Sequence, residues 1–526
     1  MTVNVGKIFA WMKEKKTIWK AAIMAFLPLL CCVAACAANG HTIGEVSIAA
    51  GEWNDELFYY KQAEGIIHYG YPQGYFGFNE SHALKASFAA WSPVLVFPWI
   101  LWGLLFGWTL SAPIYCNIFL MMIAMFVFVW LVKPTWKQLG ILTILYVAFT
   151  PLTRYMLSAM PECICFSMVI IVLALDISYL EKEHPAKLVL LFVMTAVMTL
   201  MRPYLLLFML LPAWFWIRKN RITGSLGTVG IMGVTVVSYA LIKRYFGAEY
   251  FTALFDTTWV TIFFRQGIPA GVKYVLWRLF TKGTEFMELA LEGIQTDLFY
   301  GEYFVAFLVV MLILVIQTVH NFRKKEKKQL AVNLHLLISF VGMFAALLLM
   351  YKMMEGSKHL LTFICVGIYG ICLMDTGFYK KMAAVAAVFV FLFSATAVDS
   401  YEHQIPFGSE ELSKQEAYWK EVFTEECVLD MEKTPDFENV MIWVFNDRIG
   451  EESILMPYQM LYQLTEGFGI SCCNVDYVEA NLDQLQSKYL AAAAGGRIDG
   501  LCTERGLREI GRDEGMVVYE LYGEEK

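Results

Sequence analysis

The chain has 526 residues, of which 58% are hydrophobic and only 17% are charged, and its mean hydropathy is +0.53. A soluble domain is nearer half apolar and a quarter charged, so this composition excludes an ordinary soluble protein and predicts a helical protein that crosses a membrane many times. The formal net charge of −7, with no basic stripe along the chain, argues against nucleic acid as a partner.

The first apolar segment, residues 18–38, follows a cluster of lysines, which predicts a cytoplasmic N-terminus. The loop that follows, residues 40–110, is then expected outside. Within it, residues 91–108 are rich in tryptophan, contain Pro93 and Pro98, and span only 18 positions. These features predict an interfacial or re-entrant helix rather than a crossing.

Ten further apolar segments follow, and with the first they predict eleven crossings: 112–132, 139–150, 161–180, 187–200, 204–217, 224–245, 302–319, 330–351, 360–375 and 382–398. If residues 91–108 do not cross, every basic cluster between segments faces the cytoplasm, including the run from Arg323 to Lys328. That run is most simply a signal that sets the topology, and it also suits contact with anionic lipid headgroups.

The same topology divides the chain into a transmembrane domain, residues 1–399, and a soluble domain, residues 400–526, on the extracytoplasmic side. A second long outer loop is expected at residues 247–301. In the soluble part, residues 440–445 and 516–521 read as strands, and 459–465 and 482–489 read as helices, which predicts a small α/β domain.

The acids of the first loop fit two interpretations. Asn54-Asp55-Glu56 opens a predicted helix, where two carboxylates suit the helix dipole. Alternatively, these acids, backed by Tyr59, Tyr60 and Glu64 on adjoining faces, serve as a general base or bind a divalent cation.

Further charged residues are expected on the same side. Arg154 and Glu162 form either a structural ion pair or a second acidic element facing the first loop. Arg202, just before Pro203, either binds an anion in a cavity or extends to the surface. In the late outer loop, Lys352, Lys358 and His359 either anchor the loop at the interface or form a clamp for a phosphate group.

The order of these motifs over roughly the first 400 residues resembles the GT-C superfamily of polytopic glycosyltransferases, which includes protein O-mannosyltransferases and lipid A aminoarabinose transferases. The resemblance rests on short elements that follow one another in this order: Asp55-Glu56 with Tyr59 and Tyr60, Glu64-Gly65, Ser92-Pro93, Glu162, Arg202-Pro203 and Gly356-Ser357-Lys358-His359. The late loop of the family usually has Arg-Tyr where this chain has Lys358-His359.

The resemblance implies that Asp55 or Glu56 is the catalytic carboxylate and that Glu162 is a supporting acid. Arg202 and Lys358 would contact the phosphate of a polyprenyl-phosphate sugar. It also implies that a divalent metal, Mg or Mn, could be held by Asp55 and Glu162.

The predicted function is therefore an inverting transfer of a sugar to a glycan, lipid or protein acceptor outside a bacterial plasma membrane. The alternatives are an outer-leaflet polysaccharide polymerase or ligase, a lipid or glycan transporter, and a non-catalytic sensor. A polymerase relies mainly on arginines in a large late loop, and residues 247–301 hold only Arg265 and Arg278. A transporter predicts repeated halves, which the sequence does not show.

Overall fold

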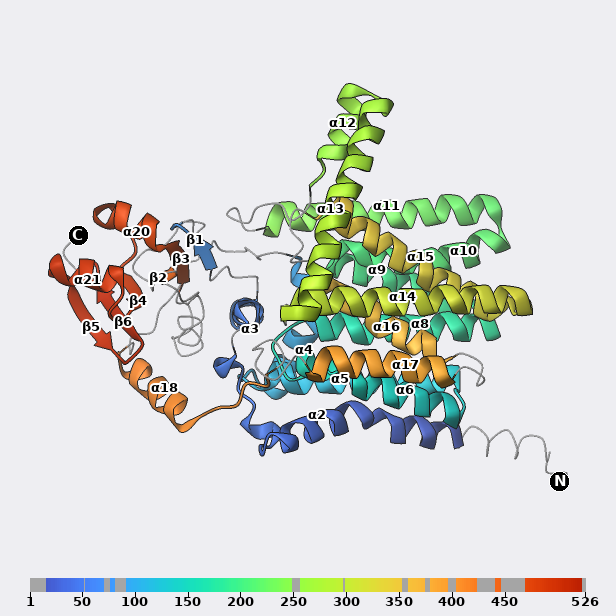
Figure 1. Ribbon diagram of the computed structural model, residues 1–526, viewed down its shortest axis with the longest axis horizontal. Helices are drawn as coiled ribbons and strands as arrows, with labels where there is room; N and C mark the ends of the chain where they lie inside the picture. The colour runs from blue at the N-terminus through green and yellow to red at the C-terminus, as the bar shows by residue number, and fades with distance from the viewer. Residues whose placement is uncertain are drawn as a thin grey trace.

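The computed structural model describes residues 16–51, 53–70, 76–80, 91–247, 256–296, 299–351, 358–373, 379–395, 404–422, 440–445 and 469–522. Its larger part is a bundle of helices that run along the long axis of the molecule, and a smaller part with a β-sheet lies beyond one end of the bundle (Figure 1). We call this end the α3 end, after helix α3 (Asn54–Tyr69), and the opposite end the lysine end, after Lys133, Lys325, Lys327 and Lys328.

Within the described ranges, six helices are long and apolar enough to cross a membrane: Lys16–Ala38, Ala112–Val132, Glu162–Glu181, Arg221–Phe246, Gly301–Lys324 and Lys327–Leu349. Shorter apolar helices accompany them at Pro93–Phe106, Trp136–Ala148, Pro185–Met201, Leu360–Cys372 and Met382–Phe393. About 20 apolar residues span the hydrocarbon core of a bilayer. The chain is thus a multi-pass membrane protein, while the count of eleven crossings and the sidedness of the termini stay predictions.

The helices follow the apolar segments expected from the sequence. Their bounds are α2 (Leu27–Ala38), α4 (Phe97–Phe106), α5 (Ala112–Val132), α6 (Trp136–Ala148), α7 (Pro151–Met156), α8 (Glu162–Glu181), α9 (Pro185–Met201), α10 (Leu210–Lys219), α11 (Arg221–Phe246), α14 (Phe299–Lys324), α15 (Lys327–Leu349), α16 (Leu360–Cys372) and α17 (Tyr379–Val390). Helix α8 lies at the centre, and 78% of its 18 most apolar consecutive residues are buried. The corresponding share for α11, at the edge, is 11%.

Helix α4 has 10 residues, preceded by the 3₁₀ turn η3 (Pro93–Val96). A helix of that length is about 15 Å long, roughly half of the hydrocarbon thickness. Because α10, in a segment expected to cross, also has 10 residues, this length does not decide the matter, and an interfacial or re-entrant helix stays a prediction.

Pro203 breaks the next pair of segments. It ends α9 and leaves Arg202 in an extended conformation (φ −146°, ψ 120°), after which the chain turns through the 3₁₀ helix η4 (Pro203–Met209). A residue before proline is disfavoured in a helix, and proline cannot donate the next helical hydrogen bond. The break therefore places an arginine inside the bundle at the α3 end.

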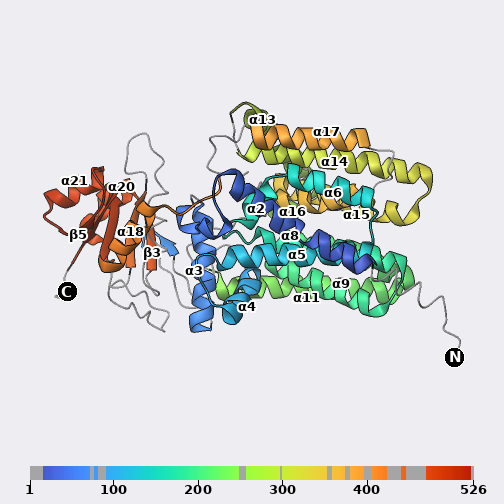
Figure 2. The same cartoon turned by 90° about the horizontal axis from the view of Figure 1, so that it is seen from below.

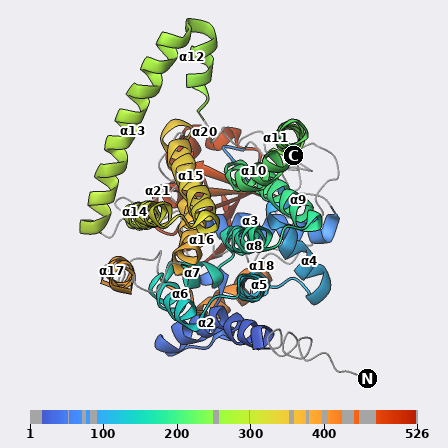
Figure 3. The same cartoon turned by 90° about the vertical axis from the view of Figure 1, so that its right-hand side faces the viewer.

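The second long loop contains two helices, α12 (Thr258–Gln266) and α13 (Ile268–Thr296), which lie across the bundle rather than along it (Figures 1 and 3). Arg278 fastens α13 to the bundle by donating to the carbonyls of Leu349 (3.0 Å) and Tyr351 (2.9 Å). Ile268 and Phe280 are exposed on α13. Such an amphipathic helix is typical of a membrane interface.

In the described residues the sheet has six strands, in the order β1-β3-β2-β4-β6-β5. The strands are β1 (Phe76–Phe78), β2 (Val440–Phe445), β3 (Gly469–Asn474), β4 (Tyr489–Ala493), β5 (Arg508–Arg512) and β6 (Met516–Glu520), and the accompanying helices are α18 (Glu410–Val422), α20 (Val475–Asn481) and α21 (Arg497–Glu504). Strands β1, β3, β2 and β4 are parallel, and β6 pairs antiparallel with β4 and β5.

Strands β2 and β6 confirm the two predicted strands. The predicted helix at 482–489 is wrong, because a 3₁₀ turn (Leu482–Gln484) is followed by β4 from Tyr489. Within this stretch the backbone N–H groups of Gln486 and Ser487 donate to Oε1 of Glu80, so they are not available for helical hydrogen bonds. The helix expected at 459–465 lies outside the described residues.

The first loop contributes to this sheet, since β1 pairs in parallel with β3. The carboxylate of Glu80 fixes the connection, because its Oε1 accepts from the backbone N–H of Gln486 (2.9 Å) and of Ser487 (2.8 Å). The small domain is thereby joined to the same loop that carries α3.

Candidate functional site

Helix α3 lies across the end of the bundle, between the membrane helices and the sheet (Figures 1 and 2). It ends at Gly70, whose φ of 76° is the left-handed conformation that favours glycine. The helix is buried on nearly all sides although it is polar: Glu56, Tyr59, Tyr60, Gln62 and Glu64 are each at most 7% exposed. The side chain of Asp55, by contrast, is 32% exposed.

Asp55 meets the late loop. The Nζ of Lys358 donates to Oδ2 of Asp55, and the two residues are 303 positions apart in the sequence. Both side chains are partly exposed, at 22% for Lys358 and 32% for Asp55, so solvent can reach the pair. An ion pair in this setting contributes little to stability, and it can open when a ligand competes for either partner.

Glu56 has a different environment. Its side chain is fully buried, and its Oε1 accepts from the backbone N–H of Ala159 at 2.8 Å. A Cβ atom added to Gly51 would lie 2.5 Å from its Oε2, so a larger residue there would force the Glu56 carboxylate to shift. These contacts hold the start of α3 against the chain between α7 and α8. The two neighbouring acids, which the sequence could not separate, thus differ sharply in access to solvent.

A second ion pair lies deeper. Nη2 of Arg202 donates to Oε1 of Glu162 at 2.6 Å, and both side chains are completely buried. Nη1 of Arg202 donates to the hydroxyl of Tyr204 at 3.1 Å and to Nδ1 of His359. The arginine therefore links the start of α8, the break after α9 and the start of α16.

His359 must be neutral in this arrangement. A guanidinium can only donate, so Nδ1 accepts and the ring proton is on Nε2. Burial lowers the pKa of His359, and the positive charges of Arg202 and Lys358 act in the same direction. The ring also packs edge-on against Trp91, with centroids 5.2 Å apart.

Other predicted residues make separate contacts. Tyr59 is fully buried, and burial raises its pKa well above the usual value. Tyr60 stacks on Trp108, with ring centroids 5.0 Å apart. Nζ of Lys61 forms an ion pair with Glu64 at 2.9 Å.

Arg154 does not pair with Glu162. Its guanidinium lies 3.8 Å from the centre of the Trp53 ring, and its Nη1 donates to the carbonyl of Leu157 at 3.4 Å. Lys352 lies outside the described residues. The expected Arg154–Glu162 ion pair is therefore not found, and Arg202 pairs with Glu162 instead.

Tyr204, Tyr351 and Trp91 complete the cluster, and no sequence pattern distinguishes them from the other interfacial aromatics of this chain. The rings of Tyr204 and Tyr351 have centroids 5.3 and 5.7 Å from that of His359. Both tyrosines also line an apolar groove of about 490 Å³, bounded by η4, α11, α12 and α15. The charged cluster and an apolar groove therefore share a wall.

The two candidate metal ligands do not fit a metal centre as arranged here. Asp55 is neutralised by Lys358 and Glu162 by Arg202, so a cation would have to displace both partners. No group of three or more His, Cys, Asp or Glu side chains suited to a metal is found in the part of the chain that the structure describes. A divalent metal thus stays a prediction from the family resemblance.

No protein-family model matches the sequence, and no curated protein matches it. The fold is similar to two crystal structures of ArnT from Cupriavidus metallidurans. For ArnT bound to undecaprenyl phosphate, the TM-score is 0.49 at 9% sequence identity, covering 95% of this chain and 98% of that one. For the apo state, the TM-score is 0.38 at 10% identity, covering 89% and 93%. With TM-scores this low, neither likeness establishes the family or the function of this chain.

Proposed function

We propose that the protein is a membrane glycosyltransferase of the GT-C type. It transfers a sugar from a polyprenyl-phosphate donor to a hydroxyl group of an acceptor on the extracytoplasmic side. The observation that carries the proposal is the Asp55–Lys358 pair, a partly exposed carboxylate held against a cation. The next residue, His359, packs against Tyr204 and Tyr351, which line the apolar groove. The motif order that resembles the GT-C superfamily supports it.

The groove and the cluster suit the two parts of such a donor. The polyprenyl chain is purely apolar, and it would lie in the groove next to Tyr204 and Tyr351. Its phosphate would then reach the charged cluster, where Lys358 is the accessible cation. Arg202 is completely buried and already holds Glu162 and His359, so it has to move before it can contact a phosphate.

Donor binding and activation of the base are coupled in this scheme. The phosphate draws Lys358 away from Asp55, which frees Oδ2 to accept a proton. The acceptor hydroxyl oxygen then attacks the anomeric carbon while the bond from that carbon to the phosphate oxygen breaks. The hydroxyl proton goes to Asp55, the polyprenyl phosphate leaves with its electron pair, and the anomeric configuration inverts.

The remaining residues hold this geometry. Arg202 and Glu162 fix the position of His359, and the backbone of His359 fixes that of Lys358. Glu56 anchors the first turn of α3, from which Asp55 projects. We therefore assign Asp55 as the base, Lys358 as the phosphate contact, and Glu56, Glu162, Arg202 and His359 as positioning residues.

The test uses the full-length protein in membranes with a radiolabelled polyprenyl-phosphate sugar. Asp55→Asn keeps the shape of the side chain but cannot accept the proton, so transfer should fall by about 10²- to 10⁴-fold while the protein still folds. The matched control is Glu45→Gln, which neutralises an exposed acid of the same loop and should leave transfer unchanged.

The assay needs several polyprenyl-phosphate donors that carry different sugars, because the site does not identify the sugar. If Asp55→Asn transfers as fast as the wild type with every donor that the wild type accepts, Asp55 is not the base. If the wild type transfers from none of the polyprenyl-phosphate sugars, the proposed activity itself is wrong.

A further inference from the structure

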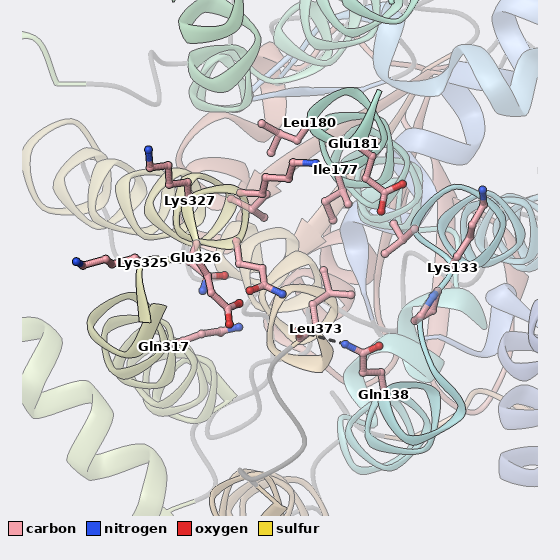
Figure 4. A pocket seen from close by; sticks show the side chains of 16 residues that line it. Lys133, Gln138, Ile177, Leu180, Glu181, Gln317, Lys325, Glu326, Lys327 and Leu373 are labelled. Carbon is pink, nitrogen blue, oxygen red and sulfur yellow. Dashed lines mark hydrogen bonds between the residues drawn. The ribbon is translucent and has the colours of Figure 1, made fainter. Parts of the chain in front are cut away.

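The lysine end of the bundle contains a cavity that takes no part in the proposed reaction. It has a volume of about 590 Å³ and lies where the α5–α6 turn, the end of α8, the α14–α15 turn and the end of α16 meet. Figure 4 shows it with Lys133 on one side and Lys325 and Lys327 on the other. Helix α3, whose Asp55 pairs with Lys358, lies at the opposite end of the bundle (Figure 1).

The charges around this cavity are unbalanced. Among the described residues, four lysines line it, Lys133, Lys325, Lys327 and Lys328, against two glutamates, Glu181 and Glu326. The lysines are all exposed, and in Figure 4 those labelled extend outward from the rim. Their flexible four-carbon stems allow the ammonium groups to turn toward a bound anion.

The floor of the cavity is polar, buried and incompletely hydrogen-bonded. Asn333 is 3% exposed, and its Nδ2 has no hydrogen-bond partner among the described residues. Gln317 is also 3% exposed. Its Nε2 donates to the carbonyl of Gly370 at 3.4 Å, and its Oε1 has no hydrogen-bond partner among the described residues. Leaving a buried polar group unpaired costs about 1–3 kcal/mol, so these amides are suited to a ligand.

The N-terminus of α15 faces the same space. Helix α15 has 23 residues and begins at Lys327, and its N-cap Glu326 makes no side-chain capping hydrogen bond. The first amides of a helix have no partner within it, and with the helix dipole they favour a negative charge. Lys328 and Gln329, which carry two of these amides, line the cavity.

We propose that this cavity binds a phosphate ester. The phosphate would be held by the rim lysines and the first turn of α15, and Nδ2 of Asn333 would donate to the ligand from below. Oε1 of Gln317 can accept from a hydroxyl group on the same ligand. Two sources offer this chemistry, the headgroup of an anionic phospholipid and a soluble phosphate ester. The proposal does not depend on the transferase activity.

The test measures binding to the purified full-length protein in detergent. The lipid arm compares phosphatidylglycerol with a diacylglycerol of the same acyl chains by native mass spectrometry. The soluble arm adds glycerol 3-phosphate or inorganic phosphate and follows thermal unfolding. A ligand that binds only the folded state raises the unfolding temperature in a saturable way.

The pocket variant is Lys325→Gln with Lys327→Gln, and the control is Arg323→Gln with Lys324→Gln. The control removes the same charge from the same turn, but neither of its residues lines the cavity. We expect the pocket variant to bind about ten- to a hundredfold more weakly than the control, since hydrogen bonds to charged groups are lost. Asn333→Leu should weaken binding in the same direction without changing the net charge.

The outcomes separate the sources. Saturable binding in the lipid arm alone identifies a lipid headgroup, and binding in the soluble arm alone identifies a soluble phosphate ester. If neither arm gives saturable binding to the wild type, the cavity is not a phosphate site. Equal loss in the pocket variant and the control would show that only the overall charge of the turn matters, and the proposal would be wrong.

Discussion

The two ends of the helical bundle treat charge in opposite ways. At the α3 end, acids and bases from distant parts of the chain pair with each other: Asp55 with Lys358, and Glu162 with Arg202. At the lysine end, four lysines and two glutamates surround a cavity whose buried amides have unpaired atoms in the described structure. The charges of the first arrangement are paired without a ligand, although Oε2 of Glu162 and Nε of Arg202 have no hydrogen-bond partner among the described residues. In the second arrangement the described lysines outnumber the glutamates. We therefore propose that a substrate has to open the first arrangement, whereas an anion would complete the second.

The largest effect on stability is expected at the buried pair. Glu162→Gln leaves the charge of Arg202 buried without its counter-ion, which should cost about 3–5 kcal/mol of unfolding free energy. The double substitution Glu162→Leu with Arg202→Met should recover much of this loss. Denaturant unfolding of the full-length protein in detergent provides the measurement. A cost below about 1 kcal/mol, as for an exposed pair, would remove the contrast between the buried and the accessible pair.

Lys358→Met tests the accessible pair. It removes the cation that we assign to the donor phosphate while keeping an unbranched side chain of similar length. Loss of a hydrogen bond to a charged group should lower kcat/KM about ten- to a hundredfold, mainly through KM for the donor. Initial rates over a range of donor concentrations would show this. A large fall in kcat with unchanged KM would instead place Lys358 in the chemical step.

His359 makes the α3 end sensitive to acid. Its pKa in the folded protein is lowered, chiefly by burial, so the unfolded chain binds a proton more readily than the folded one below the ordinary value of about 6.5. The contribution of His359 to stability is therefore complete above that pH and declines as the pH falls below it. Thermal unfolding between pH 7.5 and about 5 should show the decline.

The matched control for this pH dependence is His359→Gln, which should flatten it. Gln offers a side-chain oxygen to Arg202 and does not titrate. An identical decline in the variant would assign the effect to other groups.

The smallest effect is expected at the lysine end. Asn333→Leu replaces an amide whose Nδ2 has no partner among the described residues with an apolar group of similar size. In lipid-free detergent this should not lower the unfolding free energy, because little hydrogen bonding is lost and an unpaired buried amide is removed. The same unfolding assay compares it directly with Glu162→Gln. A cost of several kcal/mol would mean that the amide is needed for the fold itself, and the two ends would then be alike.

Much of the bundle could be predicted from local patterns. Runs of apolar residues such as 112–132 became α5 with the expected bounds, and Pro203 broke the chain at Arg202. The alternation of Val440–Phe445 predicted β2 correctly. These features depend on hydrophobic burial and on the backbone limits of single residues, which are visible in a short window.

The small domain shows where this reasoning failed. The helix expected at 482–489 is reduced to one 3₁₀ turn, because the N–H groups of Gln486 and Ser487 donate to Glu80, which lies 406 and 407 positions earlier in the chain. The recruitment of Phe76–Phe78 into the sheet of this domain has no local signal either, since its partner β3 is almost 400 residues away.

The sequence by itself determined that this is a multi-pass membrane protein with an acidic, aromatic first loop and a charged late loop. Only the tertiary structure decided which charges meet. It made Asp55 accessible and buried Glu56, and it made Arg202, instead of Arg154, the partner of Glu162. It also placed buried amides with unpaired atoms in the same cavity as the lysines of the α14–α15 turn. The reason is physical. Hydrophobicity and backbone preference act over a few neighbouring residues, whereas a charge or an amide is satisfied by whichever group the fold brings within about 3 Å.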